Sequence, residues 1–101
     1  MCIVTEIVTM KTVDGITKEK FIDIVNELER NYHSNQPGFI DTELLFDDSK
    51  GDWIIIQHWD SMENLKSASK KMFQDTAASS FVQSLDPKSV KMTMLPQLRK
   101  W

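Results

Sequence analysis

The chain has 101 residues, of which 41% are hydrophobic and 27% charged, and its net charge is −3. This length suits one domain with a real hydrophobic core, and the acidic balance argues against nucleic acid as a partner. No apolar run approaches the roughly 20 residues that a membrane span requires, and the N-terminus lacks the features of a signal peptide. We expect a single domain over 1–101, with a core of about 3–95 and a short C-terminal tail, in the cytoplasm without membrane contact.

The first half of the chain reads as a strand, a long helix and a second strand. Residues 2–10 are rich in β-branched side chains and predict a strand. Thr17 is a suitable N-cap for a helix to about residue 34, with one apolar stripe formed by Phe21, Ile24, Val25, Leu28 and Tyr32. Pro37 and Gly38 end this helix, and residues 39–46 predict the second strand.

Residues 53–59, with the sequence WIIIQHW, predict a third strand that is apolar on both faces. Alternation places Trp53, Ile55, Gln57 and Trp59 on one side and Ile54, Ile56 and His58 on the other. A small antiparallel sheet normally keeps one face in water. Because this strand needs cover on both faces, we expect a second copy of the chain to supply the missing layer.

The remaining residues predict helical segments followed by a last strand. Asp60 or Ser61 caps a helix with an apolar line of Leu65, Ala68 and Met72, and a second stripe runs from Ala77 to Leu85 after a break near 74–76. Residues 90–94 alternate and Pro96 closes the strand. The order is βαββαβ, which predicts a ferredoxin-like α+β fold with a four-stranded antiparallel sheet and its helices on one face.

A few polar or aromatic residues stand out from this pattern. Glu6 lies on a strand expected to be central, where a carboxylate should be paired, raised in pKa or open to a cavity. His58 points toward the expected second layer, as an interface residue or a general base. His33 suits the negative end of the helix dipole, and Trp59 is either a pocket wall or a core plug.

The segments Pro37-Gly38-Phe39-Ile40 and Trp59-Asp60-Ser61-Met62-Glu63-Asn64-Leu65 carry a family resemblance. With the long helix before them, they resemble the antibiotic biosynthesis monooxygenase (ABM) domain over roughly residues 3–95. The resemblance implies a homodimer in which two sheets pack face to face as a dimeric α+β barrel. It also implies quinone-forming monooxygenase activity that needs no cofactor.

A heme-degrading branch of this family uses an Asn in the first strand, a Trp at the end of the third and a His on the second helix. Trp59 matches the Trp, whereas the first strand has no Asn and Ser69 falls near the place of the His. Two of the three roles are vacant, including the iron ligand, which argues against heme degradation. The single cysteine, Cys2, also excludes a Cys-x-x-Cys metal site, and we expect no metal.

The sequence leaves two main functions open. The first is an ABM-type monooxygenase acting on a small aromatic or quinol-like substrate, with Glu6 and His58 as catalytic candidates and Trp59, Tyr32, Phe21 and Met72 as substrate-binding candidates. The second is a non-catalytic dimer that binds a small apolar or aromatic ligand in the same place, which the sparse set of polar residues favours. A structural dimer without any ligand is a third possibility.

Overall fold

The computed structural model describes residues 2–101, and its elements follow the predicted order. The strands are β1 (Val4–Met10), β2 (Phe39–Asp47), β3 (Asp52–Trp59) and β4 (Lys91–Pro96). The α-helices are α1 (Lys18–Asn31), α2 (Met62–Met72) and α3 (Ser79–Ser84). Short 3-10 turns lie at His33–Asn35, Thr76–Ala78 and Pro87–Ser89.

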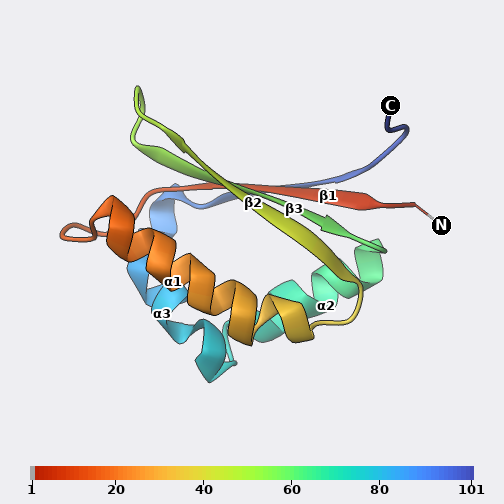
Figure 1. Ribbon diagram of the computed structural model, residues 1–101, viewed down its shortest axis with the longest axis horizontal. Coiled ribbons are helices and arrows are strands. Elements are labelled where there is room, and N and C mark those ends of the chain that lie inside the picture. Colours follow the sequence, from red (N-terminus) through yellow and green to blue (C-terminus); the bar gives the residue numbers. More distant parts are fainter. Residues whose placement is uncertain (1) are drawn as a thin grey trace.

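The four strands form one antiparallel sheet in the order β2-β3-β1-β4. The three helices lie together on one side of this sheet, and both chain ends lie at the same end of the molecule (Figure 1). This is the predicted ferredoxin-like α+β fold. Among residues 2–101, no helix is long and apolar enough to cross a membrane.

Local capping sets where the helices begin and end. The Thr17 hydroxyl accepts a hydrogen bond from the Lys20 backbone N–H at 3.1 Å and starts α1 as predicted. The α-helix ends at Asn31 rather than near residue 34, because its last turn tightens into the 3-10 turn at His33–Asn35. Of the two candidate caps for α2, Ser61 is the one used, and it accepts from the Asn64 N–H at 3.1 Å.

Aromatic side chains fill the core between sheet and helices. Phe21 of α1 packs on Trp53 of β3 with ring centroids 4.7 Å apart, and Phe46 lies at the same distance on another side of Trp53. At the other end of β3, Trp59 is buried with Leu65 and Ala68 of α2. The inner face of β3 is therefore fully covered by the chain's own helices.

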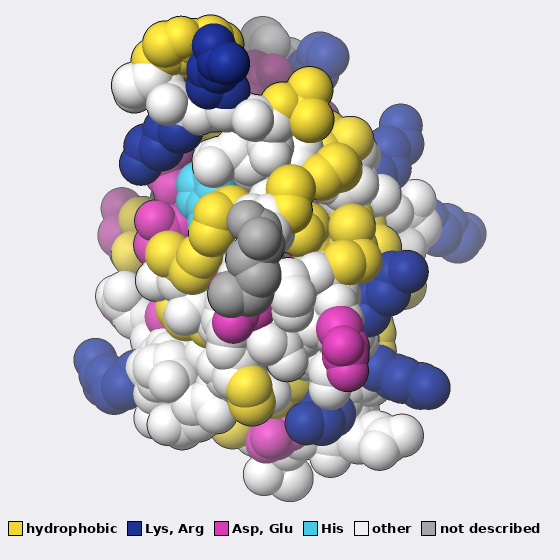
Figure 2. Space-filling view, turned by 90° about the vertical axis from the view of Figure 1, so that its right-hand side faces the viewer, with side chains coloured by type: hydrophobic (Ala, Val, Ile, Leu, Met, Phe, Trp, Pro, Cys, Tyr) yellow, Lys and Arg dark blue, Asp and Glu magenta, His cyan; other side chains and the backbone are white. Residues whose placement is uncertain are grey.

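The outer face of the sheet has no such cover within residues 2–101. Burial alternates strictly along β3, with Ile54, Ile56 and His58 only half-buried on this face. Ile56 pairs with Ile7 of β1 across the sheet. Figure 2 looks onto the end that carries both chain ends and shows hydrophobic side chains gathered on the surface. The sequence expectation of a strand that is apolar on both faces is confirmed, with one face covered.

Candidate functional site

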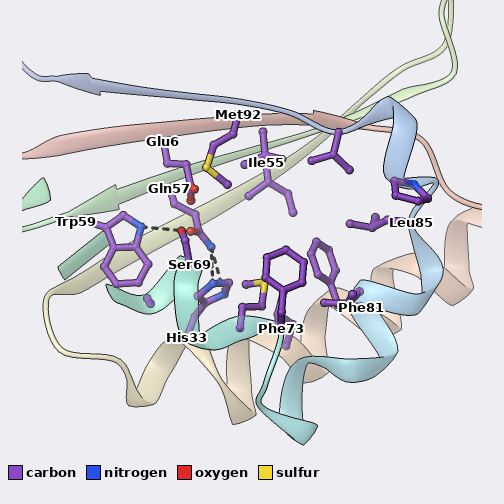
Figure 3. Close-up of a pocket in the computed structure, with 17 residues that line it drawn as sticks. Glu6, His33, Ile55, Gln57, Trp59, Ser69, Phe73, Phe81, Leu85 and Met92 are labelled. Carbon is purple, nitrogen blue, oxygen red and sulfur yellow. Dashed lines mark hydrogen bonds between the residues drawn. The ribbon is translucent and has the colours of Figure 1, made fainter. Parts of the chain in front are cut away.

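A cavity of about 210 Å³ lies between the inner face of the sheet and the helices. Most of its wall is apolar, and it is formed by α2, α3, β4 and the centre of the sheet (Figure 3). Its apolar lining includes Ile55, Ala68, Met72, Phe81 and Met92. Cavities of this kind, apolar with a few convergent polar groups, are typical small-molecule sites.

One end of the cavity is polar, and five residues from four parts of the chain meet there: Glu6, His33, Gln57, Trp59 and Ser69. Glu6 is only 4% exposed. Burial raises the pKa of its carboxyl above the ordinary 4.5, while the charge of His33 and the hydroxyl of Ser69 oppose this rise. A carboxyl with a raised pKa at the end of an apolar cavity is a candidate for proton transfer.

A hydrogen-bond network orders this polar end. The Trp59 indole Nε1–H donates to Gln57 Oε1 at 3.3 Å, and Gln57 Nε2 donates to Thr42 Oγ1 at 3.0 Å. The same Gln57 nitrogen lies 3.2 Å from Nδ1 and 3.4 Å from Nε2 of His33. His33 Nδ1 also hydrogen-bonds to Glu29 of α1. The indole, the amide and the imidazole therefore hold one another in place.

The structure brings only part of the sequence-predicted site together. Glu6, Trp59 and Met72 all line the cavity. Phe21 instead lies in the core between Trp53 and Phe81, and Tyr32 uses its hydroxyl to donate to the Ala68 carbonyl, joining α1 to α2. Neither of these two aromatic residues reaches the cavity wall, because neighbouring core side chains enclose them.

His58, the second catalytic candidate, lies on the opposite face of the sheet from Glu6. Its Nδ1 hydrogen-bonds to Asp41 Oδ1 of the neighbouring strand at 2.6 Å, and a third of its side chain is exposed. The structure therefore separates His58 from the cavity by the full thickness of the sheet. The geometry favours its role as a residue of the outer face.

His33, Gln57 and Ser69 are the site residues that sequence reasoning missed. The sequence indicates only a helix-dipole role for His33, although this residue is 3% exposed and lines the cavity. Gln57 interrupts the apolar inner face of β3, and this break in alternation is a signal that could have identified it. For Ser69 the signal is the family resemblance, which puts this residue near the place of the His on the second helix.

The donor set at this end does not suit a metal ion. Across the described residues, no group of three or more His, Cys, Asp or Glu side chains lies close enough to hold one. The polar groups are instead a carboxyl, an imidazole, an amide and a hydroxyl around an apolar space. They can recognise and exchange protons with a hydroxyl group on an otherwise apolar molecule.

Comparison with known proteins gives one family and several similar folds. The family model for antibiotic biosynthesis monooxygenase matches residues 3–78. No curated protein matches the chain.

Among solved structures, a mutant of SnoaB from Streptomyces nogalater, a cofactor-independent oxygenase, superposes with a TM-score of 0.74 at 13% identity over 97% of this chain and 95% of that one. A candidate antibiotic biosynthesis monooxygenase from Caulobacter crescentus gives 0.75 at 15% identity, over 97% and 92%. At these identities the structural likeness establishes the fold alone.

Proposed function

The chain belongs to the antibiotic biosynthesis monooxygenase family, and on that premise we propose that it oxidises a small phenol or quinol with dioxygen and without a cofactor. The observation that carries this proposal is the apolar cavity with a buried carboxyl, Glu6, at its polar end. SnoaB, which has a similar fold, is described as a cofactor-independent oxygenase. The substrate class is our inference from the shape and polarity of the cavity.

The cavity suits a flat, electron-rich ring with one polar substituent. Trp59 forms the wall beside the polar end, where an aromatic ring can pack against the indole. The hydroxyl of the substrate then faces Glu6 and Ser69, while the rest of the ring lies against Met72, Phe81 and their neighbours. A charged substrate would meet almost no compensating partners along this apolar wall.

The first step is proton removal. The Glu6 carboxylate takes the phenolic proton and leaves an electron-rich phenolate. Burial makes this carboxylate a stronger base than a solvated glutamate, because its pKa is raised. The apolar walls exclude water that would otherwise stabilise the anion and slow its oxidation.

The second step is transfer of electrons to dioxygen. The phenolate gives one electron to O₂, and the resulting radical pair joins at a ring carbon to form a peroxide. The peroxide takes a proton, the ring carbon loses its hydrogen, and the O–O bond breaks to release water. A phenol with an unsubstituted ring carbon plus O₂ therefore gives a quinone plus H₂O. The protein supplies the base, the position and the dry cavity.

A homodimer through the outer face of the sheet is the second part of the proposal. Ile54 and Ile56 of β3 and Ile7 of β1 form a half-buried apolar patch at the centre of that face. Burying this patch against a second copy removes apolar surface from water without disturbing the cavity on the inner face. The uncovered face supports this interface.

Oxygen consumption with a panel of phenols and hydroquinones tests the activity. We expect the wild-type protein to consume one O₂ for each quinone that appears in the absorption spectrum. Glu6→Gln should lower kcat/KM by about 10²–10⁴-fold, the range for a lost general base. Glu27→Gln is the matched control, because Glu27 is exposed on α1 and does not line the cavity.

The binding-only alternative predicts a different result. A thermal-shift screen of the same panel would then give stabilisation by a phenol that is never consumed. That outcome contradicts the proposed monooxygenase, whereas full activity in Glu6→Gln contradicts Glu6 as its base.

A further inference from the structure

We propose that His33, held in place by Glu29, is a second proton-transfer group of the cavity. This inference rests on the proposed function and names the partner of Glu6 in it. His33 lines the cavity and is 3% exposed, although it follows α1, where the sequence indicates only a helix-dipole role. A carboxylate, an amide and three aromatic side chains pack around its ring.

Glu29 determines which ring nitrogen carries the proton. It lies four residues before His33, on the same side of the helix end, and its Oε2 hydrogen-bonds to His33 Nδ1. Within residues 2–101, the other carboxylate oxygen of Glu29 is buried without a hydrogen-bond partner. A carboxylate only accepts, so a neutral His33 has its hydrogen on Nδ1 and its lone pair on Nε2.

The orientation of the Gln57 amide is fixed by Trp59. An indole N–H is a donor only, so it requires the amide oxygen, and this places the amide nitrogen toward His33 and Thr42. That nitrogen is nearly equidistant from the two ring nitrogens, at 3.2 Å and 3.4 Å. The lone-pair directions of the two nitrogens diverge, so the amide lies over the ring face rather than in line with either one.

The remaining sides of the ring are held by aromatic side chains. Phe39 stacks on it with ring centroids 5.5 Å apart and an interplanar angle of 20°. Trp59 and Tyr32 meet it edge-on, with centroids 6.0 Å and 5.3 Å away. Packing thus fixes the ring plane, Glu29 fixes the tautomer, and Nε2 is left as the nitrogen available to a bound molecule.

Glu6 and His33 approach the polar end from different layers. Figure 3 shows Glu6 descending from the sheet and His33 below it at the end of α1, with Gln57 and Ser69 between them. The charge of His33 also influences the Glu6 carboxyl, so the two groups act on the same space. The polar groups that face His33 are therefore Glu29 from α1, Glu6 from β1 and Gln57 from β3.

The chemistry needs two proton carriers because it acts on two faces of one ring. Glu6 takes the phenolic proton and returns it to the peroxide. The oxidised ring carbon lies beside the hydroxyl, at the polar end, and it carries the peroxide on one ring face and its hydrogen on the other, toward His33 and away from Glu6. His33 Nε2 takes this proton, the C–H electron pair forms the C=O bond, and the O–O bond breaks. The departing hydroxide then takes the proton from His33 and leaves as water.

Product stoichiometry in His33→Gln tests the proton transfer. Oxygen uptake should continue, while quinone formation slows by about 10²-fold and an organic hydroperoxide, titratable with iodide, accumulates. Wild-type quinone yield per O₂ in His33→Gln overturns the inference and leaves the role of Glu6 intact. A loss of oxygen uptake equal to that in Glu6→Gln also overturns it, because His33 would then act in the first step.

Nitrogen-15 NMR of the two histidines tests the positioning without any turnover. We expect one fixed Nδ1–H tautomer for His33 in the wild type and in Glu29→Gln, which retains an acceptor. Glu29→Ala should give mixed tautomers, and Glu27→Ala, an exposed neighbour on α1, should give the wild-type pattern. A mixed tautomer in the wild-type protein overturns the assignment of Glu29.

A phenol that cannot be oxidised separates the inference from the proposed function. 4-Cyano-2,6-dimethylphenol is blocked at the ring carbon opposite its hydroxyl and at the two carbons beside that hydroxyl. Its binding should shift the His33 Nε2 resonance and leave His58 unchanged. A shift without turnover of any phenol contradicts the monooxygenase and supports His33 as the contact. Quenching of tryptophan fluorescence without this shift contradicts the contact.

Discussion

Glu6 is the residue at which stability and the proposed chemistry oppose each other. It shares the inner face of β1 with Val8 and the buried Val4 and Met10, yet its carboxyl occupies the same layer. Removing an ionised carboxyl from water is unfavourable, which is why burial raises its pKa. A side chain with only a structural role would be replaced by an apolar residue at little loss, so its position favours a function.

The raised pKa of Glu6 predicts a pH-dependent effect of Glu6→Gln on stability. Below pH 4.5 the carboxyl is protonated in both folded and unfolded chains, and the two proteins should melt alike. Above it, the unfolded chain releases the proton first, so wild-type stability falls as pH rises toward the folded-state pKa. We expect the Tm of Glu6→Gln to exceed that of the wild type at pH 8, and the difference to grow as the pH rises from 4.5 toward the folded-state pKa.

Calorimetry between pH 4 and pH 8 measures this difference. Glu27→Gln controls for the loss of one negative charge, because Glu27 is exposed on α1. Its Tm should follow the wild type at every pH. A Glu6→Gln advantage that is constant with pH would contradict burial as the cause.

At the scale of elements, Gly38 joins the start of β2 to the start of α2. Its φ of +80° lies in the left-handed region, and its carbonyl accepts from the Asp60 N–H at 2.8 Å. A Cβ on Gly38 would overlap the side chains of Asp60 and Asn64, which hydrogen-bond to each other at 2.8 Å. This close approach fixes the position of α2, and with it Ser69 and Met72, relative to the sheet.

Gly38→Ala should therefore lose more stability than a glycine substitution at an open turn. We expect a cost of about 2–4 kcal/mol, from strain at positive φ together with the steric overlap. Gly15→Ala is the matched control, because Gly15 has a φ of +89° and a Cβ added there would meet nothing within 4 Å, so it should lose only about 1 kcal/mol. Urea unfolding measures both, and equal losses would contradict the close approach.

At the scale of the whole molecule, the two faces of the sheet have different tasks. The inner face carries the cavity and is covered by the helices, whereas the outer face holds the half-buried isoleucines and the His58–Asp41 pair. Further apolar surface is exposed on β4 and the C-terminal tail, including Leu95, Leu98 and Trp101. A second copy packed on the outer face would cover the centre of this surface.

Ile56→Asp should disrupt such a dimer. The carboxylate would enter the centre of the interface, opposite Ile7 in the register, where it would lose its hydration. We expect light scattering at micromolar concentration to give the mass of two chains for the wild type and of one chain for Ile56→Asp. Circular dichroism should show the same secondary structure in both.

Ile22→Asp is the matched control for this substitution. Ile22 is 46% exposed on α1, on the helical side of the molecule, so its replacement should leave the mass unchanged. A dimer that survives Ile56→Asp, or dissociates equally in Ile22→Asp, would contradict the outer face as the interface.

Local patterns in the sequence were enough to establish the order of the elements, the βαββαβ topology and the inner and outer faces of β3. These features follow from side-chain periodicity and capping, which act over a few residues. Glu6 and Trp59 could also be predicted as site candidates, because a carboxylate and a large aromatic ring stand out in a predicted strand. A local break in pattern was sufficient for both predictions.

Packing between the helices and the sheet decides which of these residues line the same cavity. Phe21 and Tyr32 lie on the same apolar stripe as other core residues, and only packing shows that they are enclosed away from the cavity. His33 gained its role through contacts with Gln57 and Phe39, the first of them 24 residues away. A cavity is the space that packed elements leave between them, so its lining depends on distances that no local pattern contains.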